Sequence, residues 1–330
     1  MKGKVKFSIQ NNHIAFKFDF ERNVTVITGD SGTGKTKLIN MVRNYSELGK
    51  ASGVKLKCYS EVIREDGKKS KIERPCVVLS GNTWDTVLEK TKGSIVFVEE
   101  STSFLTSHEF AIAIQQSDNY YVFVTREPLP QIPYSIDAVK QIVKNGKKPK
   151  VEKVYNGIGV RKISSFPYDL VIVEDSGSGF TFFSKASGKQ NVSCISAKGK
   201  SNFLPVLNKR SEERILIIAD AAALGSEIRE LLKFRRESGK KIDFFLPESF
   251  EWLVLKSDIF TSNDNVKKIL EKPIDYIESS EFFSWERFFT HTLVEKTKDN
   301  PDLRYSAKKN RLPKGYIAEA NMDSILRAMK

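Results

Sequence analysis

The sequence predicts an α/β protein with a parallel sheet in each of two domains, and three observations support this class. Short apolar, β-branched runs alternate with segments of helical periodicity, which is the pattern of βα units. Several runs end on glycine or on a carboxylate, as strands of open parallel sheets do at a ligand site. The length of 330 residues is enough for about two domains with separate cores.

Composition and charge restrict the class of protein. Hydrophobic residues make up 40% and charged residues 29% of the chain, as in soluble globular proteins. No apolar run of about 18 residues predicts a membrane span and the N-terminus has no signal-peptide pattern, so we expect a cytoplasmic protein with no membrane partner. A net charge of +13 favours a nucleic-acid partner, DNA more than RNA, although solubility or an anionic membrane would explain the same charge. Cys58, Cys76 and Cys194 form no metal or disulfide pattern and are expected in the core.

The chain begins with two alternating segments. Residues 4–9 and 14–18 alternate apolar and polar side chains around a turn at Asn11-Asn12, which predicts an antiparallel pair of strands at the edge of the first domain. Further along, residues 54–59 and 75–79 are expected as strands, residues 64–71 as a charged hairpin tip and residues 83–92 as a helix.

The most specific motif lies between the first strands and these later elements. Eight consecutive residues match the phosphate-loop pattern G-x-x-x-x-G-K-S/T: Gly29, Asp30, Ser31, Gly32, Thr33, Gly34, Lys35 and Thr36. An apolar run precedes them and an amphipathic segment follows, so the strand–loop–helix context disfavours a chance match. In such a loop the backbone N–H groups and the helix N-terminus bind phosphates. We expect Lys35 to contact the β- and γ-phosphates of ATP and the Thr36 hydroxyl to bind Mg²⁺.

Two carboxylates end a later strand. The apolar run 94–98 leads directly to Glu99 and Glu100, at the edge of a parallel sheet where ligands bind. In phosphate-loop ATPases the first acid holds the Mg²⁺ shell and the second polarises the attacking water, and Glu99 and Glu100 fit these roles. Glutamate in place of aspartate at the first position makes direct metal contact doubtful. After an expected helix at 101–117, the strand 120–124 precedes Thr125 and Arg126, which are candidates to sense the γ-phosphate; a structural ion pair of Arg126 with a glutamate is the alternative.

These motifs carry a resemblance to a known class. Another βα element separates the acidic strand from the loop strand, and residues 1–143 thereby resemble the additional-strand, catalytic-glutamate phosphate-loop ATPases. That length is small for an ABC-type ATPase, which implies a reduced helical arm and slow hydrolysis. The next residues, 144–150, are basic and contain Gly146 and Pro149, so they predict a domain boundary, with a phosphate-binding patch as the alternative.

The second half repeats the combination of strand and acid. We expect a linker with a short hairpin at 144–167, a domain at 168–275 and an aromatic, basic helical segment at 276–330. Glu174 ends one apolar run, Asp220 ends another, and a helix that starts at Ser249 carries Glu251. Carboxylates gathered at one edge of a parallel sheet would make an Mg²⁺ site suited to phosphodiester chemistry.

This arrangement resembles the Toprim fold, the acidic module of topoisomerases, primases and OLD-family nucleases. The resemblance implies that Glu174 acts as general acid/base or metal ligand and that Asp220 is the first acid of a D-x-D pair. The second acid is missing, because residue 222 is alanine. Asp175, Glu248 or Glu251 would have to compensate, or the site is degenerate.

Together the two halves resemble OLD-like nucleases of bacterial defence and mobile elements. The resemblance implies that ATP binding controls an Mg²⁺-dependent domain that acts on nucleic acid. It is also compatible with a homodimer that binds ATP between its two copies. A non-catalytic nucleotide switch that binds a protein partner is the alternative, and a small-molecule kinase is a weaker one.

The last segment is first aromatic and then basic. Trp285, Phe288 and Phe289 have the spacing of a helix core face rather than of a base-stacking surface. The lysines and arginines between residues 296 and 314 are expected to contact phosphate or to form a solvated tail, and residues 322–329 a short helix.

Overall fold

The computed structural model describes residues 1–63, 69–81, 83–146, 148–159 and 166–329. The chain is of the α/β class and divides into two compact units, one of residues 1–156 with 272–284 and one of residues 157–271 with 285–330. This division differs from the expected boundaries, because the segment that begins at 276 is shared between the units. In the described ranges, no helix is long and apolar enough to cross a membrane.

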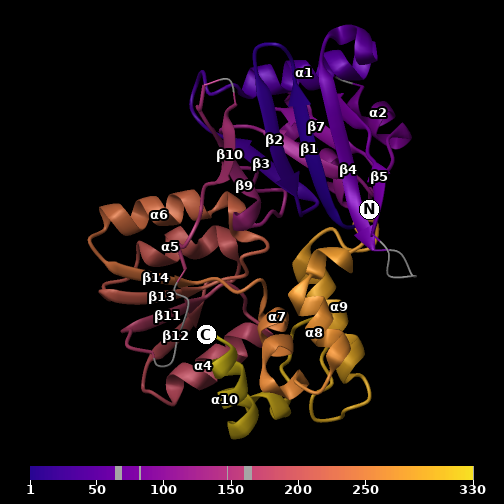
Figure 1. Ribbon diagram of the computed structural model, residues 1–330. Coiled ribbons are helices and arrows are strands. Elements are labelled where there is room, and N and C mark those ends of the chain that lie inside the picture. The colour runs from indigo at the N-terminus through magenta and orange to yellow at the C-terminus, as the bar shows by residue number, and fades with distance from the viewer. Residues whose placement is uncertain (64–68, 82, 147, 160–165, 330) are drawn as a thin grey trace. The chain divides into compact units, whose positions relative to one another are not determined.

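The first unit is built on a six-stranded sheet with the order β10-β9-β3-β8-β7-β6 (Figure 1). Its strands are β3 (Val24–Thr28), β6 (Cys76–Leu79), β7 (Ile95–Glu99), β8 (Tyr120–Val124), β9 (Val139–Val143) and β10 (Lys150–Lys153). All neighbours are parallel except β9 and β10, which pair antiparallel. One strand, β8, therefore lies between the loop strand β3 and the acidic strand β7. The basic run at 144–150 ends in β10 and belongs to this unit rather than linking two units, with Lys147 outside the described residues.

A second, antiparallel sheet of this unit has the order β2-β1-β4-β5. Its strands are β1 (Lys4–Gln10), β2 (Ala15–Phe20), β4 (Lys55–Ile63) and β5 (Lys69–Glu73). The expected pairing of the first two strands is confirmed, with Val5 opposite Phe20 and Gln10 opposite Ala15. The expected hairpin tip falls largely on residues 64–68, outside the described residues.

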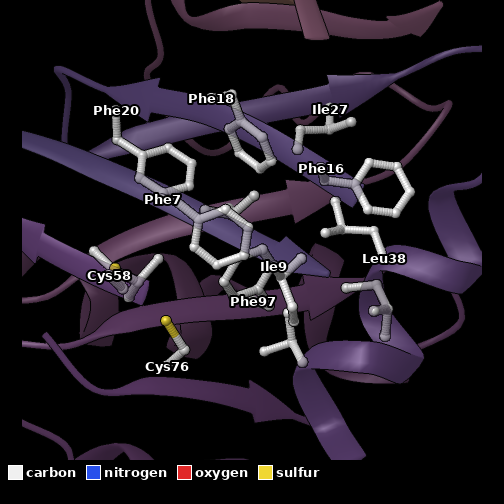
Figure 2. Close-up of a cluster of buried hydrophobic side chains, with 14 of the residues drawn as sticks. Phe7, Ile9, Phe16, Phe18, Phe20, Ile27, Leu38, Cys58, Cys76 and Phe97 are labelled. Atoms are coloured by element: carbon white, nitrogen blue, oxygen red, sulfur yellow. The ribbon is translucent and has the colours of Figure 1, made fainter. Parts of the chain in front are cut away.

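Alternation along the parallel strands gives the central sheet two buried faces. On one face, Ile27, Phe97 and Val122 pack with helix α1 (Lys35–Leu48) and with the antiparallel sheet. Figure 2 shows Phe7 of β1 over Phe97, with ring centroids 5.4 Å apart. The other face packs against α2 (Trp84–Lys90) and α3 (His108–Gln115). Cys58 and Cys76 are buried in the first of these cores, as expected.

The second unit contains a four-stranded, fully parallel sheet with the order β12-β11-β13-β14. Its strands are β11 (Leu170–Val173), β12 (Ser193–Ser196), β13 (Arg214–Ile218) and β14 (Lys241–Phe245). Its helices are α4 (Ser178–Gly188), α5 (Phe203–Leu207), α6 (Ile228–Glu237), α7 (Phe250–Lys256), α8 (Asp264–Glu271), α9 (Trp285–Thr297) and α10 (Glu319–Ala328). Helix α7 packs against α8, α9 and α10. Phe288 and Phe289 of α9 are buried, which confirms the expected core face. The expected linker with a short hairpin at 144–167 includes residues 160–165, which lie outside the described residues.

Candidate functional site

The first candidate site is the loop between β3 and α1. Gly34 precedes α1 with φ of 110°, and a Cβ atom there would lie 3.3 Å from Cζ of Phe16. Because side chains rarely adopt this backbone conformation, the position requires glycine. The first turn of α1 contains no acidic residue, and its N-cap, Gly34, has no side chain that could accept hydrogen bonds from the N–H groups of this turn. The N–H groups of that turn, with the positive end of the helix dipole, are therefore available to an anion.

Lys35 folds back over this loop. Its Nζ donates a hydrogen bond to the carbonyl of Asp30 at 2.9 Å and another to the carbonyl of Gly29. Burial lowers the pKa of Lys35, Arg126 lowers it further, and Glu100 acts in the opposite direction. An anion in the loop would offer the ammonium a stronger acceptor than these neutral carbonyls.

A cavity of about 370 Å³ opens over the loop, within the size range of small-molecule sites. Its walls come from the loop, the end of β7, the end of β8 and the connection between β9 and β10. The lining residues are Ile14, Asp30, Gly32, Thr33, Gly34, Lys35, Thr36, Lys37, Glu99, Glu100, Val124, Arg126, Lys144, Gly146 and Pro149. Loop and acids, 63 positions apart between Thr36 and Glu99, thus share one cavity. The sequence did not point to Ile14, and it offered Lys144 mainly as part of a domain boundary.

Both expected acids at the end of β7 have basic neighbours. Glu99 Oε2 accepts a hydrogen bond from Arg43 Nη2 of α1 at 3.2 Å, a contact that the sequence did not predict. Glu100 Oε2 accepts one from the backbone N–H of Arg126 at 2.9 Å, and Glu100 Oε1 lies 3.7 Å from Arg126 Nε. Arg126 therefore pairs with a glutamate and also lines the cavity. Thr125 is buried and its hydroxyl bonds both backbone groups of Glu127, so this side chain is engaged within its own turn.

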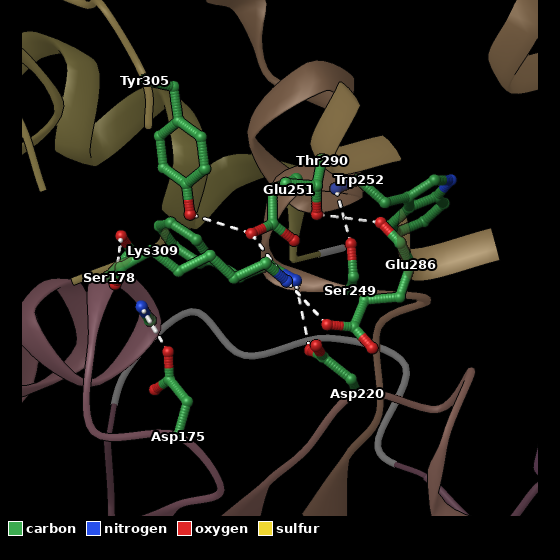
Figure 3. Close-up of polar contacts among 12 residues, drawn as sticks. Asp175, Ser178, Asp220, Ser249, Glu251, Trp252, Glu286, Thr290, Tyr305 and Lys309 are labelled. Carbon is green, nitrogen blue, oxygen red and sulfur yellow. Dashed lines mark hydrogen bonds and ion pairs between the residues drawn. The ribbon is translucent and has the colours of Figure 1, made fainter. Parts of the chain in front are cut away.

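The second candidate site lies where β11 and β13 of the second unit end. Figure 3 shows Asp220 of this site and the polar side chains around it. Glu174 follows β11 and Asp220 follows β13, and the Asp220 N–H donates a hydrogen bond to Glu174 Oε2 at 3.1 Å. Asp220 Oδ1 accepts a hydrogen bond from the Phe250 N–H at 3.2 Å, at the start of α7. Burial raises the pKa of Glu174 to about 7 and the pKa of Asp220 above its ordinary value, and the carboxylate of Glu286 raises both further. The ammonium of Lys200 acts on Glu174 in the opposite direction.

Lys309 supplies a further cation of this second site. Its Nζ lies 3.1 Å from Glu251 Oε1 and 2.6 Å from Glu286 Oε1, and Tyr305 donates a hydrogen bond to Glu251 Oε1 at 2.8 Å. Burial alone would lower the pKa of Lys309, but the carboxylates of Glu251, Glu286 and Asp220 outweigh burial and raise it. The lysine is therefore charged. The sequence predicts Lys309 only as a phosphate contact or as part of a solvated tail. It does not predict that Glu286 and Tyr305 belong to this site.

Asp175 and Glu248, the other candidates to replace the acid that is missing at position 222, are placed differently from Glu251. Asp175 accepts hydrogen bonds from the N–H groups of Gly179 at 3.0 Å and Phe180 at 2.6 Å, so it caps α4. Ala222 is buried, and its N–H donates to the carbonyl of Glu248 at 3.3 Å. Among the described residues, no group of three or more histidine, cysteine, aspartate and glutamate side chains is arranged to hold a metal ion.

No protein-family model, curated protein or solved structure matches this chain. What the protein does must therefore be inferred from the chemistry of its two sites.

Proposed function

We propose that the first unit binds ATP with Mg²⁺ and hydrolyses it, and that its nucleotide state controls a Toprim-like second unit that acts on nucleic acid. One observation carries the first part: Lys35, Thr36, Glu99 and Glu100 line the same cavity above the phosphate-loop pattern. The position of β8 between β3 and β7 is further support, because an added strand there is typical of the ATPase class that this half resembles.

The donor set of this cavity suits magnesium. Mg²⁺ prefers oxygen ligands and keeps several waters while it binds substrate phosphates. The Thr36 hydroxyl and the Glu99 carboxylate are such oxygens, and the hydrogen bond from Arg43 favours a role of Glu99 through water. Bound Mg²⁺ would neutralise charge on the phosphates.

The protein's own groups would divide the remaining work. Lys35 would exchange the carbonyls of Gly29 and Asp30 for phosphate oxygens. Glu100 would orient the attacking water and accept its proton. Arg126, which lines the same cavity with its Nε 3.7 Å from Glu100, would stabilise charge that develops on the transferred phosphoryl group.

For the second unit, the proposal rests on Glu174 and Asp220 at the ends of adjacent parallel strands. Carboxylate oxygens are the ligands that Mg²⁺ prefers, and both side chains are only partly buried, so a substrate phosphate has access to them. The net charge of +13 favours a polyanionic substrate, with DNA ahead of RNA. A homodimer across the ATP site is part of the same proposal.

The test is cleavage of supercoiled plasmid and of single-stranded DNA with Mg²⁺ or Mn²⁺, each with and without ATP. We expect cleavage by the wild type, its loss in both Glu174→Ala and Asp220→Ala, and no change in Glu237→Ala, which removes an exposed carboxylate from the end of α6. Cleavage that persists in both site variants would assign the activity elsewhere.

A non-catalytic nucleotide switch is the second candidate. The observation in its favour is that residue 222 is alanine, so the second acid of the expected pair is missing. It predicts ATP binding with no cleavage under any of these conditions and with no salt-dependent uptake of DNA, since the net charge would then serve solubility and the second unit would bind a protein.

A further inference from the structure

The backbone of Lys309 is held in place by the start of α4. Its carbonyl accepts hydrogen bonds from the Ser178 N–H at 2.9 Å and from the Ser178 hydroxyl at 3.1 Å. A Cβ atom at Gly177 would lie 2.1 Å from the same carbonyl oxygen, so only glycine fits there. Lys309 also has φ of 53°, a region that residues other than glycine rarely adopt. Local strain of this kind persists where the surroundings fix a residue, and it is common at functional sites.

The side chain that is fixed in this way ends among carboxylates. Its ammonium lies between Glu251 and Glu286, at 3.1 Å and 2.6 Å from their nearest oxygens (Figure 3). Glu251 is 1% exposed, and in the described part of the chain its second oxygen, Oε2, is buried without a hydrogen-bond partner. A buried oxygen that lacks a partner is costly and calls for an additional donor or cation.

The acids outnumber the lysine. Asp220 interacts electrostatically with Glu174, Glu251 and Glu286 as well as with Lys309. Glu174 also interacts with Lys200 and Glu227, which form an ion pair with each other at 3.3 Å. Beyond that ion pair, four carboxylates and the one ammonium of Lys309 leave enough negative charge to bind one divalent ion. Glu174 and Asp220, at the two strand ends, are partly exposed, whereas Glu251 is buried.

We propose that Lys309 replaces one of the two divalent ions that phosphodiester chemistry at paired acids commonly uses. The second unit would then bind a single ion, at Glu174 and Asp220, while the ammonium of Lys309 holds the second cation position against Glu251 and Glu286. This inference rests on the proposed function of the second unit. It also explains why residue 222 can be alanine, because an acid at that position is dispensable when the ammonium of Lys309 takes the place of one of the two ions.

The test counts Mn²⁺ ions bound to the full chain, by equilibrium titration with detection of free Mn²⁺ by electron paramagnetic resonance and without nucleotide. The first unit is the same in all variants, so its contribution cancels in the differences. We expect Lys309→Ala to bind one more ion per chain than the wild type, Lys309→Arg to match the wild type, and Asp220→Ala to bind one fewer. An unchanged count in Lys309→Ala, or in Asp220→Ala, overturns the proposal.

A second variant keeps the test decisive if Lys309→Ala does not fold. Lys309→Met keeps most of the length of the side chain and removes its charge, and we expect it to bind one more ion than the wild type, as Lys309→Ala does. An unchanged count in Lys309→Met would overturn the proposal. The counts are independent of DNA cleavage, so an inactive wild type with the expected counts would refute the proposed nuclease function and leave the single-ion site standing.

Discussion

Replacement of Lys35 by alanine is expected to weaken ATP binding by about one to three orders of magnitude. Lys35 Nζ donates to two loop carbonyls, those of Gly29 and Asp30. On ATP binding, these neutral acceptors would be exchanged for charged phosphate oxygens, and a hydrogen bond between charged groups contributes about 1.5–3 kcal/mol. Two such bonds contribute about 3–6 kcal/mol, and the loss of two loop contacts of about 1 kcal/mol each leaves about 1–4 kcal/mol. Since each 1.4 kcal/mol or so is tenfold in affinity, the loss is roughly 5- to 700-fold.

The assay is calorimetric titration of ATP with Mg²⁺ into each purified variant. Lys50→Ala is the matched control, because it removes the same charge from an exposed residue beyond the far end of α1 and should bind as the wild type does. Glu100→Gln should keep its affinity and lose about 100-fold or more in turnover, because the group that accepts the proton is gone. If Lys35→Ala loses less than about threefold in affinity, or if Glu100→Gln loses as much as Lys35→Ala, the assigned roles are wrong.

Three further results are expected. Gly34→Ala should abolish ATP binding and destabilise the protein by about 1–3 kcal/mol, because its φ of 110° strains any side chain and the new Cβ meets Phe16; urea unfolding measures this. Metal-free protein should lose stability as the pH rises from about 4.5 to about 7, since the raised pKa of Glu174 means that the folded state holds a proton that the unfolded state has released; thermal melts with a chelator measure this. Tyr305→Phe should cost about 1–3 kcal/mol in urea unfolding, because the buried carboxylate of Glu251 loses its donor at 2.8 Å.

Each of these expectations has a control in the same chain. Gly49→Ala has positive φ but nothing within 4 Å of the new Cβ, so it should cost less than Gly34→Ala; equal costs would rule out the contact with the ring. Glu174→Gln should reduce the loss of stability between pH 4.5 and 7, with the remainder due to Asp220, whose pKa burial also raises; an undiminished loss would assign it to groups other than Glu174. Tyr316→Phe loses a hydrogen bond to a neutral carbonyl at 2.7 Å and should cost less than Tyr305→Phe; the reverse order would refute the role of the charged acceptor.

Sequence patterns predicted the elements whose signals are local. The alternation in residues 4–18 predicted the β1 and β2 pair, and the apolar runs ending on acids predicted parallel strands with carboxylates at one edge. The expected helix at 101–117 is divided in the structure into a 3₁₀ turn at Ser103–Thr106 and α3. The reason is Ser107, whose hydroxyl accepts a hydrogen bond from the Phe110 N–H and so begins a new helix; this capping signal was present in the sequence and was overlooked.

Partners that are distant in the chain could not be predicted in this way. Arg43 and Glu99 are 56 positions apart, and Tyr305 and Glu251 are 54 apart, with no periodicity that links them. The basic residues at 296–314 form one group by composition, yet within it Lys309 contacts the buried carboxylate of Glu251 and the partly exposed one of Glu286. Its partners depend on how α7, α9 and the segment after α9 pack, and packing of this kind follows from the whole core rather than from any local pattern.

The contacts of Lys309 also bear on the choice between a nuclease and a degenerate switch. A buried ion pair adds little net stability, because apolar residues of similar volume often do as well or better. Lys309 has a strained backbone conformation, and it lies beside Glu251, whose buried Oε2 has no partner among the described residues. A switch that needs only a neutral second unit gains nothing from the strain or from the unpaired oxygen. A site that must hold a cation at a fixed point next to a phosphate has a use for the fixed lysine and for the free carboxylate oxygen. The geometry of Lys309 thus favours a working acid site, although Ala222 taken alone indicates the opposite.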